Sequence, residues 1–166
     1  MKIGIIGAGG IADIVTPTLV QLQEAECYAV ASRSLEKAER FAAKYGFTKA
    51  YGSYEELLDD PEVELVYIAT PHSHHYAHTM MALERGKPVL CEKAFTMNAR
   101  EAKKIRDYAK EKGFFVAEAI WPRYMPSRQM IQSVIDSGII GKVNTLTANL
   151  SYAISHNRRL VDPAQA

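Results

Sequence analysis

The hydrophobic positions follow two alternating patterns through most of the chain. Short, nearly continuous apolar runs are typical of strands buried on both faces, and the segments between them repeat apolar residues at helical spacing. We predict strands over about 2–7, 27–31, 65–69, 88–91 and 114–117. Repeated strand–helix–strand units predict an α/β fold, a doubly wound parallel sheet with right-handed crossovers.

Capping residues delimit the helices predicted between these strands. Ser34, Ser53 and Asn98 are expected N-caps, and Glu56 and Glu101 stand at the capping-box positions after the last two. Helices are expected over about 10–22 (bent at Pro17), 34–46, from 53, 74–85 and 98–113, the later ones ending at Gly46, Gly86 and Gly113. The residues expected to be buried on two of them are Leu35, Ala38, Phe41, Ala42 and Tyr45, and Ala102, Ile105 and Ala109.

The pattern changes after about Ala119, which divides the chain into a domain at 1–119 and the start of an α+β domain at 120–166. A helix is expected over about 127–137, burying Met130, Ile131, Val134 and Ile135. An alternating stretch at 143–153 predicts a strand exposed on one face. Because a long strand needs a partner, we expect self-association through its edge, and the second domain reads as incomplete.

Composition adds few constraints. The chain has 166 residues, 48% of them hydrophobic, and a formal net charge of +1, which gives no support for binding to nucleic acid or a membrane surface. No apolar run is long enough for a membrane span, and the sequence starts directly with a strand, so no signal peptide is expected. Cys27 and Cys91 fall in predicted strands and are expected to be reduced core residues of a cytoplasmic protein.

A glycine-rich turn between the first strand and helix carries the first chemical signal. Gly7-Ala8-Gly9-Gly10-Ile11-Ala12 fits G-x-G-x-x-A. Gly7 permits a tight turn, Gly9 lets the backbone approach a diphosphate, and small Ala12 allows close helix–strand packing. The amides at Gly10 and Ile11 open the helix and favour an anion. Alone the motif is weak evidence, because similar turns without a ligand are common.

The end of the second strand indicates which coenzyme is preferred. NAD-binding sheets place Asp or Glu there, whereas this chain reads Ala31-Ser32-Arg33-Ser34. A hydroxyl and a guanidinium suit a 2′-phosphate, which favours NADP over NAD. The alternative is that Arg33 is only a solvated residue before a helix cap.

Two further strand ends carry polar residues. The predicted strand at 65–69 is followed by Thr70-Pro71-His72-Ser73-His74-His75, and the strand at 88–91 ends in Cys91-Glu92-Lys93-Ala94. In a doubly wound sheet these carboxyl ends border the ligand crevice. The histidines could suggest a metal, but no Cys or carboxylate stands at ligand-like spacing, so no metal site is predicted.

Four ordered blocks together resemble the Gfo/Idh/MocA oxidoreductases, and the last block is most similar to the dimeric dihydrodiol dehydrogenase-like subgroup. The blocks are the glycine turn, Thr70-Pro71-His72 with His75, Gly86-Lys87-Pro88-Val89-Leu90-Cys91-Glu92-Lys93, and Glu118-Ala119-Ile120-Trp121 with Arg123. Gly138 and Gly141-Lys142-Val143 add to the resemblance of the last block to the subgroup. The resemblance covers essentially the whole chain. It implies an NAD(P)-dependent oxidoreductase whose small-molecule substrates are sugars, polyols or related alcohols and carbonyls.

The resemblance also implies residue roles. Lys93 matches the lysine of the family's Glu-Lys-Pro motif, which lies beside the nicotinamide and assists at the substrate oxygen. Glu92 would border the coenzyme ribose, and Thr70, Pro71 and His72 would flank the coenzyme. His75 would either join this site or brace the turn as a structural histidine. Trp121 and Arg123 would reach the substrate pocket, unless Trp121 is only a packed side chain.

Two departures from the family pattern change the expectations. Ala94 replaces the motif proline, which puts the placement of Lys93 in question. Family members also continue into a sheet that covers the nicotinamide, so this chain is expected to bind NADP but to turn over poorly. Two other classes remain open: a nucleotide-sensing module that pairs through 143–153, and a coenzyme A-binding domain, which Glu92-Lys93 disfavours.

Overall fold

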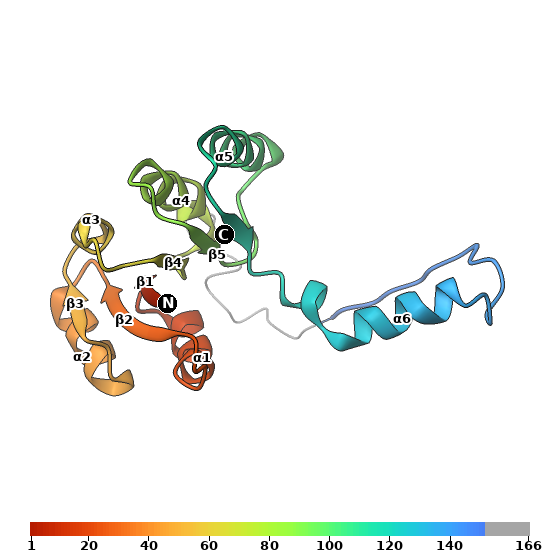
Figure 1. The fold of residues 1–166 in the computed structure, drawn as a ribbon, viewed down its shortest axis with the longest axis horizontal. Coiled ribbons are helices and arrows are strands. Elements are labelled where there is room, and N and C mark those ends of the chain that lie inside the picture. Colours follow the sequence, from red (N-terminus) through yellow and green to blue (C-terminus); the bar gives the residue numbers. More distant parts are fainter. Residues whose placement is uncertain (152–166) are drawn as a thin grey trace. The chain divides into compact units, whose positions relative to one another are not determined.

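The computed structural model describes residues 1–151, which fall into two compact units, one over Met1–Ala119 and one beginning at Ile120 (Figure 1). The first unit is built on a six-stranded sheet. Its strands are β1 (Lys2–Ile6), β2 (Glu26–Ala31), β3 (Lys49–Tyr51), β4 (Leu65–Ile68), β5 (Val89–Cys91) and β6 (Val116–Glu118). All neighbours are parallel in the order β3-β2-β1-β4-β5-β6, which confirms the doubly wound sheet.

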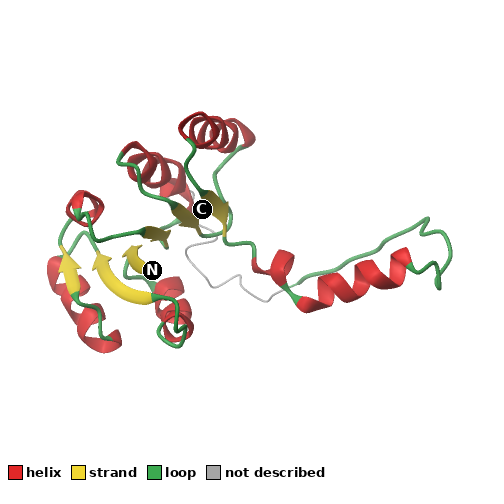
Figure 2. Cartoon of the chain, in the orientation of Figure 1, coloured by secondary structure: helices red, strands yellow, loops and turns green. Residues whose placement is uncertain are grey.

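Helices cover both faces of the sheet (Figure 2). They are α1 (Gly10–Leu19), α2 (Leu35–Tyr45), α3 (Tyr54–Asp59), α4 (His75–Glu84) and α5 (Ala99–Lys112), with a short 3₁₀ helix, η1 (His72–His74), before α4. Ile5 packs with Ala12 of α1 and Phe41 of α2 on one face. Burial on both faces explains why the central strands are almost continuously apolar.

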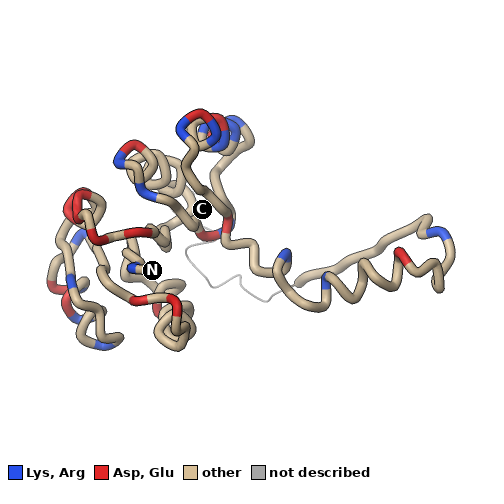
Figure 3. Tube along the Cα trace, viewed as in Figure 1, with Lys and Arg blue, Asp and Glu red and all other residues tan. Residues whose placement is uncertain are grey.

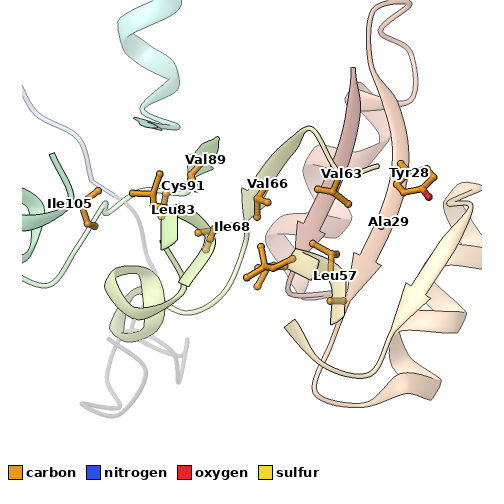
Figure 4. Packing of buried hydrophobic residues seen from close by; sticks show 14 of the residues in the cluster. Tyr28, Ala29, Leu57, Val63, Val66, Ile68, Leu83, Val89, Cys91 and Ile105 are labelled. Carbon is orange, nitrogen blue, oxygen red and sulfur yellow. The ribbon is translucent and has the colours of Figure 1, made fainter. Parts of the chain in front are cut away.

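The opposite face of the sheet holds the larger core. Leu57 of α3, Leu83 of α4 and Ile105 of α5 belong there to one cluster of buried residues (Figure 4). The cluster also contains Ile6, the neighbour of Ile5, as the alternation of side chains along a strand requires. Cys27 and Cys91 are buried and unpaired, one in each core. Burial raises the pKa of the Cys91 thiol to about 12, so the thiol stays protonated.

The predicted helix caps are confirmed. The side chains of Ser34, Ser53 and Asn98 accept bonds from backbone amides three residues on, and Gly46 and Gly113 close their helices with left-handed backbone. Several boundaries differ: α1 ends at Leu19, the sixth strand is shifted to Val116–Glu118, and α4 is preceded by η1. Leu35, predicted to be buried, is 48% exposed because it sits at the first position after the Ser34 cap.

Asp60 anchors the edge strand β3 to the end of α3. Its carboxylate accepts hydrogen bonds from Lys49 Nζ (2.8 Å) and the Tyr51 hydroxyl (2.7 Å). Burial alone would raise the pKa of Asp60, but these bonds, with one from the Glu62 amide, outweigh it and lower the pKa to about 2. Asp60 therefore remains ionised in the folded protein at pH values where an unfolded chain would protonate it.

We expect the hydrogen bonds to the Asp60 carboxylate to make the protein lose stability more steeply as the pH falls. Because the folded pKa of Asp60 lies below its ordinary value of 3.8, the stability it contributes is present above about pH 4 and is lost as the pH falls toward 2. Urea midpoints measured from pH 5 to pH 2 should fall less steeply for Asp60→Asn than for the wild type. Asp59→Asn, at the exposed neighbouring carboxylate, is the matched control and should follow the wild type. An unchanged slope in Asp60→Asn would contradict this account.

The second unit begins with the 3₁₀ helix η2 (Trp121–Tyr124) and α6 (Pro126–Asp136). The predicted helix is confirmed, but the predicted burial of its apolar stripe is wrong. These residues are exposed, because no described segment of the unit covers them: Met130, Ile131, Val134 and Ile135.

The predicted strand at 143–153 is also wrong over 143–151, which is neither helix nor strand, and Tyr152 and Ala153 lie outside the described residues. A strand exists only by bonding to a neighbour, and the described part of this unit supplies none. Within residues 1–151, no helix combines the length and hydropathy that a bilayer span requires.

Candidate coenzyme-binding site

The glycine turn lies at the centre of the sheet, where the strand order reverses between β1 and β4. Gly7 has φ +100°, and a Cβ there would lie 3.0 Å from the carbonyl oxygen of Ala69. Its amide donates to the Ala31 carbonyl of β2 (2.9 Å), and the Ala69 amide donates to Ile6 (2.9 Å). Only glycine readily adopts this positive φ and fits this close approach, so Gly7 lets the turn pass close to both β2 and the end of β4.

Open space lies above the rest of the turn. A Cβ at Gly9 or Gly10 would meet nothing within 4 Å. Gly9 is the N-cap of α1 and provides no side-chain cap, so the amides of Gly10 and Ile11 at the helix start have no side-chain partner there. Ala12, directly beneath, is fully buried against the sheet. An uncapped helix start facing open space fits a diphosphate, so the residues present suit the dinucleotide that the motif predicts.

The exit of β2 places Ser32 and Arg33 differently. Ser32 is buried, and its hydroxyl oxygen accepts a bond from the Ser34 amide (3.4 Å) at the start of α2. Arg33 is exposed and lines a cavity at the carboxyl edge of the sheet. Of the two residues predicted to hold a 2′-phosphate, the guanidinium is therefore the freer to reach a ligand. Figure 3 shows charged residues of both signs interspersed along the first unit.

His75 ties two parts of this edge together. Its ring is completely buried, with Nδ1 2.7 Å from the carbonyl oxygen of Ala94 and Nε2 2.9 Å from that of Thr70. Both nitrogens are thus used on the chain's own backbone. This geometry supports the structural interpretation of His75, and its contact with a coenzyme stays a prediction. Pro71 and His72, at the start of η1, are half-buried beside it.

Glu92 and Lys93 follow β5 at the same edge. The Glu92 carboxylate is buried; it accepts a hydrogen bond from the Tyr67 hydroxyl (2.6 Å) and another from the Lys93 amide (3.1 Å). Burial and the Glu92 carboxylate raise the pKa of Tyr67, so its hydroxyl remains a donor. The Lys93 side chain is exposed, and the Lys93–Ala94 peptide bond is cis although Ala94 replaces the motif proline.

Sequence reasoning missed Tyr67. In the sequence it is one apolar residue within a continuous strand, and nothing local distinguishes it from core. Its role depends on the register of β4 and β5, which pairs Ile68 with Cys91 and brings the end of β4 beside Glu92. The 25-residue separation between Tyr67 and Glu92 hides this contact from any local pattern.

The sheet register brings the predicted site residues to one edge. Ile6 is paired with Ala31 and with Ile68, and Ile68 with Cys91. The residues that follow these four positions therefore lie side by side: Gly7, Ser32, Ala69 and Glu92. Among residues 1–151, no group of three His, Cys, Asp or Glu could hold a metal ion. Trp121 and Arg123 lie in η2 of the second unit, both exposed, and their role stays a prediction.

A parallel sheet in this order, with a glycine turn at its switch point and an uncapped helix start above it, defines a dinucleotide-binding fold. Residues 1–119 match the Gfo/Idh/MocA family, described as an oxidoreductase family with an NAD-binding Rossmann fold. The chain belongs to this family, which confirms the resemblance drawn from the sequence.

Similar proteins include dehydrogenases and a reductase. The chain is 42% identical to trans-1,2-dihydrobenzene-1,2-diol dehydrogenase of Mus musculus, with all of this chain and 50% of that protein aligned. It is 45% identical to D-xylose 1-dehydrogenase (NADP(+)) of Hypocrea jecorina over 91% of this chain and 42% of that protein. The chain thus spans about half the length of these relatives.

Solved structures with the same fold include KijD10, a 3-ketoreductase from Actinomadura kijaniata in complex with NADP and TDP-benzene. Its TM-score is 0.80 at 30% sequence identity, over 86% of this chain and 44% of that one.

Proposed function

We propose that the first unit binds NADP across the carboxyl edge of its sheet, as the coenzyme-binding part of an oxidoreductase acting on a sugar, polyol or related alcohol or carbonyl. The observation that carries the proposal is the register that sets Gly7, Ser32, Ala69 and Glu92 side by side. The open, uncapped start of α1 would hold the diphosphate. Bound nicotinamide supplies the site with a hydride donor or acceptor.

Lys93 is the residue we assign to catalysis. Its amide is fixed by buried Glu92, which Tyr67 in turn holds, while its ammonium remains exposed at the edge of the sheet. An ammonium there would stabilise negative charge on a substrate oxygen or transfer a proton to it. Glu92 would border the coenzyme ribose, and Pro71 and His72 the nicotinamide end.

The preference for NADP rests on Arg33 and on the absence of an acidic residue in Ala31-Ser32-Arg33-Ser34. It is supported by the NADP named for the D-xylose dehydrogenase and for KijD10. Calorimetric titration of Arg33→Ala should show NADP affinity lower by about 1.5–3 kcal/mol, which is roughly 10- to 150-fold, because a charged hydrogen bond to the 2′-phosphate is lost. NAD affinity should change much less. Equal NADP affinity in the variant and the wild type would mean that Arg33 is only solvated.

Because the chain spans about half of its relatives, we expect it to bind NADP but to consume NADPH slowly with aldoses, diketones or dihydrodiols. Rapid turnover by the chain would contradict this expectation. Trp121 and Arg123 are the residues we propose for substrate contact.

We further propose that the chain forms a homo-oligomer, in a reducing, cytoplasmic setting. The exposed apolar residues of the second unit support association of some kind. Sedimentation at increasing concentration tests this part: a rise in mean mass is expected, and a monomer at every concentration would refute it.

A further inference from the structure

Two carboxylates flank Lys93 at the carboxyl edge of the first unit. Glu92 directly precedes Lys93, and its carboxylate accepts a hydrogen bond from the Lys93 amide (3.1 Å). Glu118 is the last residue of β6, and its carboxylate accepts a hydrogen bond from the Phe95 amide (2.9 Å). The register makes the second bond possible, because Cys91 of β5 is paired with Glu118. Both carboxylates are therefore fixed on the short segment that carries the Lys93 ammonium.

The bonds that hold these carboxylates leave their negative charges uncancelled. Within residues 1–151, the donors to them are the Tyr67 hydroxyl and the backbone amides of Lys93 and Phe95, all of which are uncharged. Neutral donors orient a carboxylate without removing its net charge. Glu92 is buried and Glu118 is half-buried, so solvent screens their charges only in part, whereas the Lys93 ammonium is exposed and more strongly screened.

The effect of both charges is visible at the end of β5. Burial raises the pKa of the Cys91 thiol to about 12, and the negative charges of Glu92 and Glu118 contribute to this rise. A raised thiol pKa means that a further negative charge is disfavoured at this end of the sheet. By the same sign, a positive charge placed there is favoured.

The charge of a nicotinamide ring depends on its oxidation state. The oxidised ring is positively charged, and the reduced ring, which carries one more hydride (a proton with two electrons), is neutral. When a carbonyl carbon accepts that hydride and the carbonyl oxygen accepts a proton, an alcohol forms and the ring becomes positive. Negative charge held beside the ring therefore favours its oxidised state.

We propose that Glu92 and Glu118 stabilise the oxidised, positively charged nicotinamide over the reduced one, which makes the bound coenzyme a stronger hydride donor than it would be without these charges. This inference rests on the proposed function, because it takes the ring to lie beside Lys93. It gives a role to Glu118, which has none in the proposed function although it begins the fourth block of the family resemblance. The reaction direction that these charges assist is reduction of a carbonyl to an alcohol.

Calorimetric titration with the oxidised and reduced coenzymes tests the proposal without turnover. The measured quantity is the ratio Kd(NADPH)/Kd(NADP⁺) at low ionic strength, in which the phosphates shared by the two coenzymes cancel. Glu118→Gln keeps an oxygen that can accept the Phe95 amide and removes the charge. It should lower the ratio roughly 6- to 30-fold, the range for one unit charge about 8–15 Å away at an effective dielectric constant of about 20.

Two further variants complete the test. Glu92→Gln should also lower the ratio, and Glu118→Gln alone decides the outcome if thermal unfolding shows that Glu92→Gln does not fold. Glu111→Gln makes the same chemical change at an exposed carboxylate, which is paired with Lys112 at the end of α5. This control should keep the ratio of the wild type.

The outcomes separate failure of this inference from failure of the proposed function. A wild type that binds neither coenzyme would overturn both. An unchanged ratio in Glu118→Gln would overturn the inference alone, whether the two affinities stay as they are or fall together. In the second case Glu118 would serve only to hold the segment after Lys93 in place.

Discussion

Gly9→Glu is expected to abolish NADP binding while leaving the protein folded. A side chain at Gly9 projects into open space, so it costs little stability, but the open space is where we place the diphosphate. Two unit charges 4 Å apart interact by about 4 kcal/mol at an effective dielectric constant of about 20. Affinity for NADP should therefore fall by at least about 100-fold in a calorimetric titration.

A graded series at Gly9 separates charge from size. Gly9→Gln has nearly the same shape as Gly9→Glu without the charge and should lose less affinity, and Gly9→Ala should lose least. All three should unfold within a few degrees of the wild type. NADP binding by Gly9→Glu that matched the wild type would show that the diphosphate does not lie over this turn.

Among substitutions at the carboxyl edge of the sheet, where the site lies, His75→Phe should be the most destabilising. A neutral imidazole carries one N–H, so the substitution removes the donor to one of the carbonyl oxygens of Ala94 and Thr70 and the polar neighbour of the other, in a place closed to water. An unsatisfied buried group costs about 1–3 kcal/mol, so the free energy of unfolding should fall by at least about 1–3 kcal/mol. Urea unfolding followed by circular dichroism measures this loss.

Two neighbouring variants show whether the loss belongs to these bonds. His75→Gln retains an amide donor and should recover part of the stability. His74→Phe changes the adjacent, exposed imidazole and should stay within about 0.5 kcal/mol of the wild type. A loss below about 1 kcal/mol in His75→Phe would mean that the two carbonyls find other donors.

The sequence pattern was sufficient to predict the elements that depend on contacts between residues close together in the chain. Apolar runs located β1, β2, β4 and β5, and the caps at Ser34, Ser53 and Asn98 are set by bonds that span three residues. β3 was not predicted because its three residues begin with a lysine and form no apolar run, and its position is fixed by pairing with β2. The sheet, and hence the edge where the site lies, could be predicted.

Features that depend on distant partners could not be predicted in this way. Tyr67 looks like core until the sheet register sets it against Glu92, and His75 gains its second partner, Ala94, from 19 residues away. The alternation at 143–151 suits a strand, yet no described neighbour bonds to it. Likewise α6 has the apolar stripe of a buried helix, but no described segment of its unit covers it.

Co-crystallisation of the chain with NADP tests the central claim most directly. We expect the diphosphate on the amides after Gly9, the 2′-phosphate on Arg33, and the nicotinamide ring within reach of the Lys93 ammonium. Density for the coenzyme elsewhere on the protein, or a Lys93 side chain directed away from a bound nicotinamide, would contradict the account.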